Sequence, residues 1–229
     1  MEAVVFDWDG TLVDTLAAVY RANEAVFAAI DLPFDEPLYR LHYAPDWRLM
    51  YRRLGVPPER LDEASEHWLR SIGTAPLAEA FPGTVDSLRS LAAAGVVLGL
   101  VTAGHRSVVD RQLDATGLGA LVPVRVYGDD LPVHKPNPRP LRVALSELGV
   151  ADRPAAAAYV GDAPDDMRMA RAVGVRGIGI ASVLGTPEEL LAAGAAEVAP
   201  SVGAWVDELL RSPGAGRRAA AGAATATAR

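Results

Sequence analysis

Two aspartates directly follow the first short apolar run of the chain. The run covers residues 3–6, Asp7 comes next, and Asp9 stands two positions further on. If the backbone stays extended there, both carboxylates project to one face. Two like charges so close together need a cation or a shared proton, and Mg²⁺ prefers such oxygen ligands. One carboxylate could then attack an electrophile while the other transfers protons, although the pair would also fit an ordinary turn whose aspartates cap a helix.

A second candidate site is the segment Thr102-Ala103-Gly104, which ends another apolar run. A hydroxyl followed by two small residues lets backbone N–H groups approach an anion closely, above all where a helix begins. The pattern indicates a phosphate-binding loop. A plain strand-to-helix connection with Thr102 as the helix cap is the alternative.

Lys135 is the only lysine of a chain that has 21 arginines. Where arginine is the general choice, a single lysine can mark a place that needs a compact ammonium group. Prolines at positions 136, 138 and 140 should hold the backbone extended just before a helix. This loop would present Lys135 to carboxylates and phosphate. Otherwise it is a proline-rich loop with a solvated lysine, and His134 beside it is structural.

The fourth segment runs from Gly161 and Asp162, after an apolar run, to Asp166 four residues later. Acidic residues at the start of a helix are stabilised by the helix dipole, so capping explains part of the pattern. With Asp165, however, there are three aspartates in five residues. That is more than capping requires, and it indicates further metal ligands.

All four segments stand at the ends of predicted strands. Besides residues 3–6, short apolar runs typical of buried parallel strands cover residues 96–102, 122–127, 156–161 and 175–180. Helical spacing appears between them at residues 84–94, 106–117, 138–148, 165–173 and 187–193. This alternation predicts an α/β fold with a Rossmann-like, doubly wound parallel sheet. Ligands bind at the carboxyl edge of such sheets, which is where the four segments would meet.

Residues 15–80 interrupt the alternation, because they contain no convincing strand. Apolar residues recur at helical spacing from Leu16 onward, and further helices are predicted over about 36–54 and 58–73. We therefore predict a small helical cap domain at 15–80, inserted into a core domain of residues 1–14 and 81–211. Residues 212–229 consist largely of Ala, Gly, Thr and Arg without apolar periodicity, and are predicted to be a flexible tail.

Composition excludes several classes of protein. The chain has 229 residues and no cysteine, so a disulfide scaffold and a thiolate zinc site are excluded. Its net charge of -7 argues against nucleic acid as a partner. Neither a secretory signal nor an apolar stretch of membrane-spanning length is visible. A soluble, cytoplasmic protein without a membrane partner is expected.

Taken together, the four segments resemble the haloacid dehalogenase superfamily, and within it the phosphatases related to phosphoglycolate phosphatase. The resemblance spans Asp7 to Asp166 and implies a phosphatase that acts on a small phosphorylated metabolite with Mg²⁺ as cofactor. It implies that Asp7 is the nucleophile that becomes an aspartyl-phosphate and that Asp9 is the general acid and base. The metal would be held by Asp7, the backbone carbonyl of Asp9 and Asp162, with Asp166 binding it through water or orienting Lys135. Lys135 would hold the nucleophile and neutralise charge. Phosphate and substrate contacts are implied for Gly10, Thr102, Ala103, Gly104 and Lys135.

Other members of this superfamily fit less well. Dehalogenases lack the second aspartate of the first motif, and the phosphonate-cleaving members need a lysine that this cap does not contain. A phosphosugar mutase remains an alternative, although residues 15–20 lack the hinge histidine of that group. A catalytically idle scaffold or binding protein of the same fold is a second alternative.

The substrate cannot be named from the sequence. Arg40, His42 and Arg48 in the cap could contact a phosphorylated or carboxylated molecule, but they would equally suit a solvated helix face. The sequence also leaves open whether the protein is a monomer or a homodimer, and whether the cap is open or closed. No role can be assigned to Trp8 or Asp165.

Overall fold

A six-stranded parallel sheet forms the centre of the computed structural model, which describes residues 1–212. The strands lie in the order β3-β2-β1-β4-β5-β6. Their bounds are β1 Ala3–Phe6, β2 Val97–Val101, β3 Val124–Val126, β4 Ala157–Gly161, β5 Arg176–Ile180 and β6 Glu197–Ala199. The predicted α/β class is confirmed.

Strand β1 lies in the interior of the sheet, and all four of its residues are buried. It pairs in parallel with β2 on one side and β4 on the other, so that Phe6 stands level with both Leu100 and Val160. Because the three strands run in one direction and in register, the residues that follow them meet at one edge of the sheet.

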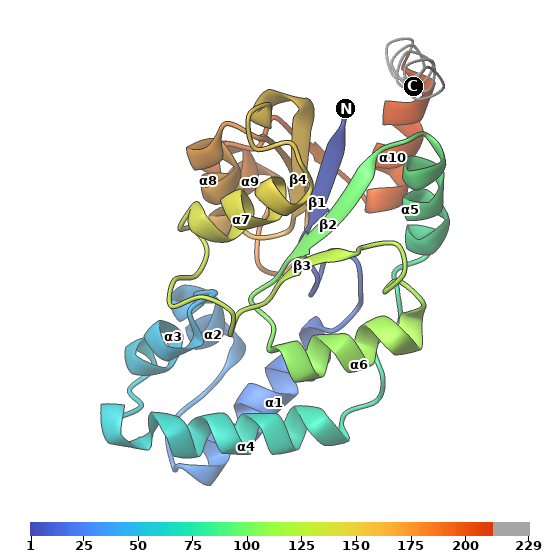
Figure 1. Cartoon of the computed structure of the whole chain (residues 1–229). Helices are drawn as coiled ribbons and strands as arrows, with labels where there is room; N and C mark the ends of the chain where they lie inside the picture. Colours follow the sequence, from blue (N-terminus) through green and yellow to red (C-terminus); the bar gives the residue numbers. More distant parts are fainter. Residues whose placement is uncertain (213–229) are drawn as a thin grey trace.

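Helices cover both faces of the sheet (Figure 1). Apolar side chains of α5, α6 and α10 pack with Val4 and Phe6 on one face, and those of α7, α8 and α9 pack with Ala3 and Val5 on the other. This makes the sheet doubly wound, as predicted. The helix bounds are α5 Thr84–Ala93, α6 Arg106–Thr116, α7 Arg139–Glu147, α8 Pro164–Val173, α9 Pro187–Ala193 and α10 Val202–Arg211, with a short 3-10 helix at Pro154–Ala156.

Four helices between β1 and α5 form the cap, which lies beyond the carboxyl ends of the strands (Figure 1). They have an apolar core of their own, which includes Phe27, Met50 and Tyr51. The cap helices are α1 Leu16–Ala29, α2 Glu36–His42, α3 Trp47–Arg53 and α4 Leu61–Thr74, with a 3-10 turn at Pro58–Arg60.

The two chain segments that connect the core to the cap lie side by side. Val13 and Ala80 form an isolated antiparallel bridge. On either side of it, the backbone N–H of Asp14 donates to the carbonyl of Glu79 at 2.9 Å, and that of Phe81 donates to the carbonyl of Leu12 at 3.0 Å. The cap is therefore attached through one paired junction.

The structure corrects the prediction of helix over residues 36–54, because this segment contains two short helices. Helix α2 ends at His42, since Pro45 cannot donate a backbone hydrogen bond and disfavours helical backbone before it. Helix α3 then starts with a cap of its own, in which Asp46 accepts from the backbone of Arg48 and Leu49. Strand β6 and helix α10 had no individual prediction.

The proposed division into a core of residues 1–14 and 81–211 and a cap of residues 15–80 remains an interpretation of this architecture. The tail expected at 212–229 lies outside the described residues except for Ser212. Among the helices within residues 1–212, none has the length and apolar character required to cross a bilayer.

Candidate active site

Three buried carboxylates meet at the carboxyl edge of the sheet. Asp7 follows β1, Asp162 follows β4, and Asp166 lies in the first turn of α8. Oxygen atoms from these three side chains all lie within 4.8 Å of one another. The convergence follows from the shared register of β1 and β4, in which the backbone N–H of Asp7 still donates to the carbonyl of Val160 at 2.8 Å.

Lys135 is the cation of this cluster. Its Nζ lies 2.5 Å from Asp7 Oδ1 and 2.9 Å from Asp166 Oδ1, and only 6% of the residue is exposed. Burial lowers the pKa of the Lys135 amine, but the charges of Asp166 and Asp7 outweigh burial and raise the pKa above its usual value. The ammonium therefore stays charged and holds the two carboxylates together.

The loop that carries Lys135 differs from the extended segment that its prolines predict. The peptide bond between Lys135 and Pro136 is cis, and the backbone N–H of Asn137 turns back to the carbonyl of His134 at 2.9 Å. The prediction of a uniformly extended loop is therefore wrong, because the chain turns directly after Lys135.

Asp166 and Asp162 are fixed by different partners. Asp166 accepts from the backbone N–H of Ala163 at 3.1 Å and from the Tyr159 hydroxyl at 3.1 Å. Asp162 accepts from the Ser182 hydroxyl at 2.6 Å. Burial, followed by the charge of Asp7, raises the pKa of Asp162 well above its usual value. Asp162 also accepts from the Thr11 hydroxyl at 3.5 Å, and the charge of Lys135 offsets the rise of its pKa only in part.

The charge balance of this cluster fits a bound Mg²⁺. Three carboxylates share one ammonium, and burial together with the charges of Asp166 and Asp9 raises the pKa of Asp7 to about 7 although Lys135 lowers it. The donors that converge are oxygen atoms, which Mg²⁺ prefers. Space is tight on one side, since a Cβ on Gly10 would lie 2.5 Å from Asp162 Oδ2.

Asp9 lies beside this cluster in the turn after β1. Its carboxylate accepts from the Thr15 hydroxyl at 2.5 Å. Burial raises the pKa of Asp9, while the hydrogen bond from Thr15 lowers it. Gly10 has a φ of +76° in the same turn, and its backbone N–H donates to the carbonyl of Val13, so this N–H is used within the turn.

Thr102 is buried at the end of β2, and its Oγ1 accepts from the backbone N–H of Gly104 at 2.9 Å. The hydroxyl hydrogen of Thr102 is left to donate to a ligand, whereas the N–H of Gly104 is already used. Ala103 and Gly104 both line a cavity that begins at this loop. Within this loop, the Thr102 hydroxyl is therefore a better candidate than the Gly104 N–H to donate a hydrogen bond to a bound anion.

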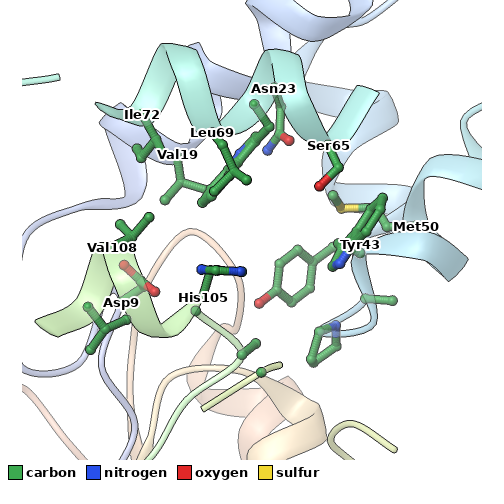
Figure 2. Close-up of a pocket in the computed structure, with 18 of the residues that line it drawn as sticks. Asp9, Val19, Asn23, Tyr43, Met50, Ser65, Leu69, Ile72, His105 and Val108 are labelled. Atoms are coloured by element: carbon green, nitrogen blue, oxygen red, sulfur yellow. The ribbon is translucent and has the colours of Figure 1, made fainter. Parts of the chain in front are cut away.

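That cavity, which we call the cap pocket, has a volume of about 150 Å³. It lies between the cap helices α1, α3 and α4 and the loop that leads from β2 into α6. Figure 2 shows Asp9, His105 and Val108 on the core side and Asn23, Ser65 and Leu69 on the cap side.

A second hollow of about 770 Å³ lies between α1 and α2 and the segments after β5 and β6. Arg40 lines this second hollow, where it lies 3.9 Å from Glu189. His42 and Arg48 line neither space, and the guanidinium of Arg48 packs 4.4 Å from the ring centre of Trp47. The three cap residues predicted from the sequence are therefore not brought together.

Trp8 and Asp165, which had no role assigned from the sequence, each have a defined partner in the structure. Trp8 is buried in the core, and its indole N–H donates to Gln112 at 2.6 Å. Asp165 pairs with Arg168 at 2.6 Å and stands apart from the cluster of Asp7, Asp162 and Asp166.

Sequence reasoning missed four residues that contact the site: Thr11, Thr15, Tyr159 and Ser182. Thr15 could have been found as a hydroxyl residue just before a predicted helix. Tyr159 lies next to Val160 in β4, and its position within a predicted strand was only a weak indication that it contacts the site. Ser182 has no signal in the sequence, because only the fold brings it to Asp162.

Comparison with known proteins gives a consistent result. A family described as haloacid dehalogenase-like hydrolase matches residues 4–180. A phosphoglycolate phosphatase of Rhodospirillum rubrum is 36% identical over 188 residues, which make up 76% of this chain and 77% of that protein. A phosphoglycolate phosphatase of Synechococcus elongatus is 32% identical over 200 residues, 84% of this chain and 90% of that protein. The crystal structure of CbbY from Rhodobacter sphaeroides in complex with phosphate aligns with a TM-score of 0.74 and 26% identity, covering 89% of this chain and 95% of that one.

Proposed function

From the premise that the chain belongs to the haloacid dehalogenase-like hydrolase family, we propose that it hydrolyses a small-molecule phosphate monoester through an aspartyl-phosphate on Asp7, with Mg²⁺ as cofactor. The observation that carries this proposal is the buried contact of Asp7 with Lys135, beside Asp162 and Asp166. The names of the curated relatives support a phosphatase that acts on a small phosphorylated metabolite.

In the first half of the reaction, a carboxylate oxygen of Asp7 attacks the phosphorus atom. The bond between phosphorus and the alcohol oxygen breaks, and the Asp9 carboxylic acid donates its proton to that oxygen. Burial raises the pKa of Asp9, which favours the protonated form that this step requires. Thr102 donates its hydroxyl to a phosphoryl oxygen.

In the second half, water attacks the phosphorus atom of the aspartyl-phosphate. Asp9, now a carboxylate, accepts a proton from this water. The bond between phosphorus and the Asp7 oxygen breaks, phosphate leaves, and both carboxyl groups return to their first state. Lys135 keeps the Asp7 side chain in position throughout, and Asp166 in turn holds Lys135.

Asp7, Asp162, Asp166 and the backbone carbonyl of Asp9 would hold the Mg²⁺. When bound, this cation would neutralise the negative charge of the phosphoryl group and of the carboxylates. The cytoplasmic location, and the absence of nucleic-acid and membrane partners, remain predictions from the sequence.

The test is phosphate release from a panel of small phosphate esters, with and without Mg²⁺, for the wild type, Asp7→Asn and Asp86→Asn. Asp86 is an exposed carboxylate on α5, away from both the cluster and the cap, and serves as the matched control. We expect release that depends on Mg²⁺, that persists in Asp86→Asn, and that falls at least about 10⁴-fold in Asp7→Asn.

Release that is equal in the wild type and Asp7→Asn would exclude the covalent intermediate. A folded wild type that binds Mg²⁺ but releases no phosphate would favour the idle scaffold. Transfer of phosphate to a second hydroxyl of a sugar phosphate, instead of to water, would identify a mutase.

A further inference from the structure

We propose that the alcohol released by this enzyme is uncharged and largely apolar, with a part about the size of an aromatic ring, and that an alcohol bearing a carboxylate is disfavoured. This inference rests on the proposed function, because it concerns the alcohol half of the same phosphate ester. The names of the curated relatives suggest a different substrate, phosphoglycolate, whose alcohol half bears a carboxylate.

The cap pocket is the space that an alcohol half would enter. Asp9, which would protonate the leaving oxygen, lines the cap pocket, as do Ala103 and Gly104 beside Thr102. In Figure 2 the carboxylate of Asp9 lies at the core side of this space. When the leaving oxygen lies next to Asp9, the rest of the alcohol therefore extends into the cap pocket.

The charge of this lining is unsuited to an anion. Among the described residues that line the cap pocket there is no lysine or arginine. Asp9 and Asp129 are its acidic residues, and His105 lies 3.4 Å from Asp129, so the one basic ring has a carboxylate partner already. A carboxylate placed here would lose its hydration without gaining a cation.

Three arginines that adjoin lining residues in the chain are held by other partners. Arg48 packs over the ring of Trp47 and Arg106 pairs with Asp130 at 2.5 Å. Arg111 donates to the backbone carbonyls of residues 72 and 73. None of these side chains lines the cap pocket, and each would have to leave its partners to reach an anion there.

The walls and the volume suit an apolar group. Val19, Leu69 and Ile72 from the cap face Val108 from α6 across the space (Figure 2). A cavity of about 150 Å³ with such walls can hold one benzene-sized ring. Asn23 and Ser65 on the cap side are uncharged, as are the tyrosines of the lining. Asn23 Oδ1 already accepts from the Tyr51 hydroxyl at 2.8 Å, which leaves the amide N–H groups of Asn23 and the Ser65 hydroxyl for a hydroxyl or amide of the alcohol.

The second hollow offers a contrasting environment. Arg21 and Arg40 line it together with Asp14 and Glu36, and with about 770 Å³ it is larger than the cap pocket. It reaches Gly10 and Thr11, but Asp9 does not line it. An anionic alcohol would meet Arg21 and Arg40 there, of which Arg40 already pairs with Glu189, and its leaving oxygen would be separated from Asp9, which would protonate it.

The experiment compares kcat/KM for benzyl phosphate, its para-carboxylated analogue and phosphoglycolate, with Mg²⁺ present. The first two esters differ only in the carboxylate on the ring, so their ratio measures the effect of charge. We expect benzyl phosphate to exceed each of the other two at least tenfold. Calorimetric titration of Asp7→Asn with the same three compounds should show the same order of affinity.

A variant pair tests whether the cap pocket sets this order. Leu69→Arg introduces a cation into the lining and should shift the ratio of phosphoglycolate to benzyl phosphate at least tenfold toward phosphoglycolate. Leu69→Met keeps the wall apolar and should keep the order of the three esters.

Other results would overturn the inference. Equal rates for benzyl phosphate and its carboxylated analogue, or a wild-type preference for phosphoglycolate, would refute it while leaving the phosphatase reaction established. A phosphoglycolate preference that is lost in Arg40→Ala would assign the substrate to the second hollow. Absence of hydrolysis of every ester would overturn the proposed function itself, and this inference with it.

Discussion

The carboxyl edge of the sheet and the cap pocket differ in how their residues are brought together. At the edge, Asp7 and Asp162 follow strands that are in register, so the local position along the chain determines where each side chain lies. In the cap pocket, Val19, Leu69 and Val108 come from three separate helices and meet only after those helices pack. The edge is a charged, hydrogen-bonded cluster, whereas the pocket is mainly apolar.

This difference separates two tasks. The edge contains groups that can attack phosphorus, transfer protons and hold a metal, and none of these depends on the rest of the substrate. The pocket contains groups that can only accept or reject an alcohol by shape and charge. Changes at the edge should therefore affect every substrate alike, and changes in the pocket should affect substrates differently.

The largest effect among the variants below is expected for Asp9→Asn. An amide cannot donate the proton to the leaving oxygen or accept one from water, so kcat should fall by roughly 10²–10⁴-fold for all esters. Steady-state kinetics with Asp86→Asn as control would measure this. A loss below tenfold, or a loss confined to one ester, would remove Asp9 from the proton transfers.

Lys135→Arg should lower kcat by about 100-fold although it keeps the charge. The planar guanidinium is larger than an ammonium group and does not fit a buried position between Asp7 and Asp166 in the same way. The reverse exchange at an exposed position, Arg139→Lys, is the control and should have no effect. Wild-type activity in Lys135→Arg would mean that charge alone is required.

Asp162→Asn should weaken the binding of Mg²⁺ by roughly 10–100-fold, measured by calorimetry with the metal alone. Asp165→Asn, which lies outside the cluster, should bind Mg²⁺ like the wild type. Binding requires carboxylates without protons, and burial raises the pKa of Asp7 to about 7. The wild type should therefore bind Mg²⁺ more weakly at pH 6 than at pH 8, and an affinity independent of pH would contradict this assignment.

Thr15→Val should lower kcat by about tenfold, because Asp9 loses a charge-assisted hydrogen bond. That hydrogen bond lowers the pKa of Asp9, so its loss should move the corresponding limb of the pH–rate profile to higher pH. Thr15→Ser keeps the hydroxyl and should restore both quantities. If Thr15→Val reduces kcat without moving the profile, Thr15 is only structural.

The smallest effect is expected in the cap, for Tyr43→Phe. The Tyr43 ring extends into the cap pocket (Figure 2), and burial raises the pKa of its hydroxyl well above the usual value, so it acts as a neutral wall. We expect KM to change by at most about threefold and the pH–rate profile to stay the same. A loss of kcat comparable to that of Thr15→Val would move Tyr43 from the pocket to the reacting edge.

The same difference explains what could be predicted from the sequence. Asp7, Asp162 and Asp166 stand in short motifs after apolar runs, and parallel strands bring such positions to one edge. Lys135 lies nine residues beyond the end of β3, and it was found because it is the only lysine of the chain. The division of residues 36–54 into two helices was missed, because helical spacing of apolar residues continued across Pro45.

The surroundings of the site were harder to predict. Ser182 lies 20 residues from Asp162 in the sequence, and only the return of the chain after β5 brings them together. Arg40 and Arg48 look like substrate contacts by residue type, but helix orientation turns one toward the second hollow and the other onto Trp47. Side-chain direction in the cap depends on packing between helices, which apolar spacing does not specify.

The paired junction at Val13 and Ala80 has a consequence for how such a protein can change. Because the chain leaves and re-enters the core at adjacent points, the whole segment between them can be exchanged as one piece, as domain insertions are at neighbouring termini. An exchange of this kind would leave β1, the two aspartates Asp7 and Asp9 that follow it, and the loop that carries Lys135 unchanged in the chain and in the register of the sheet. Recombination at a single pair of breakpoints would then give the same catalytic machinery a different range of substrates.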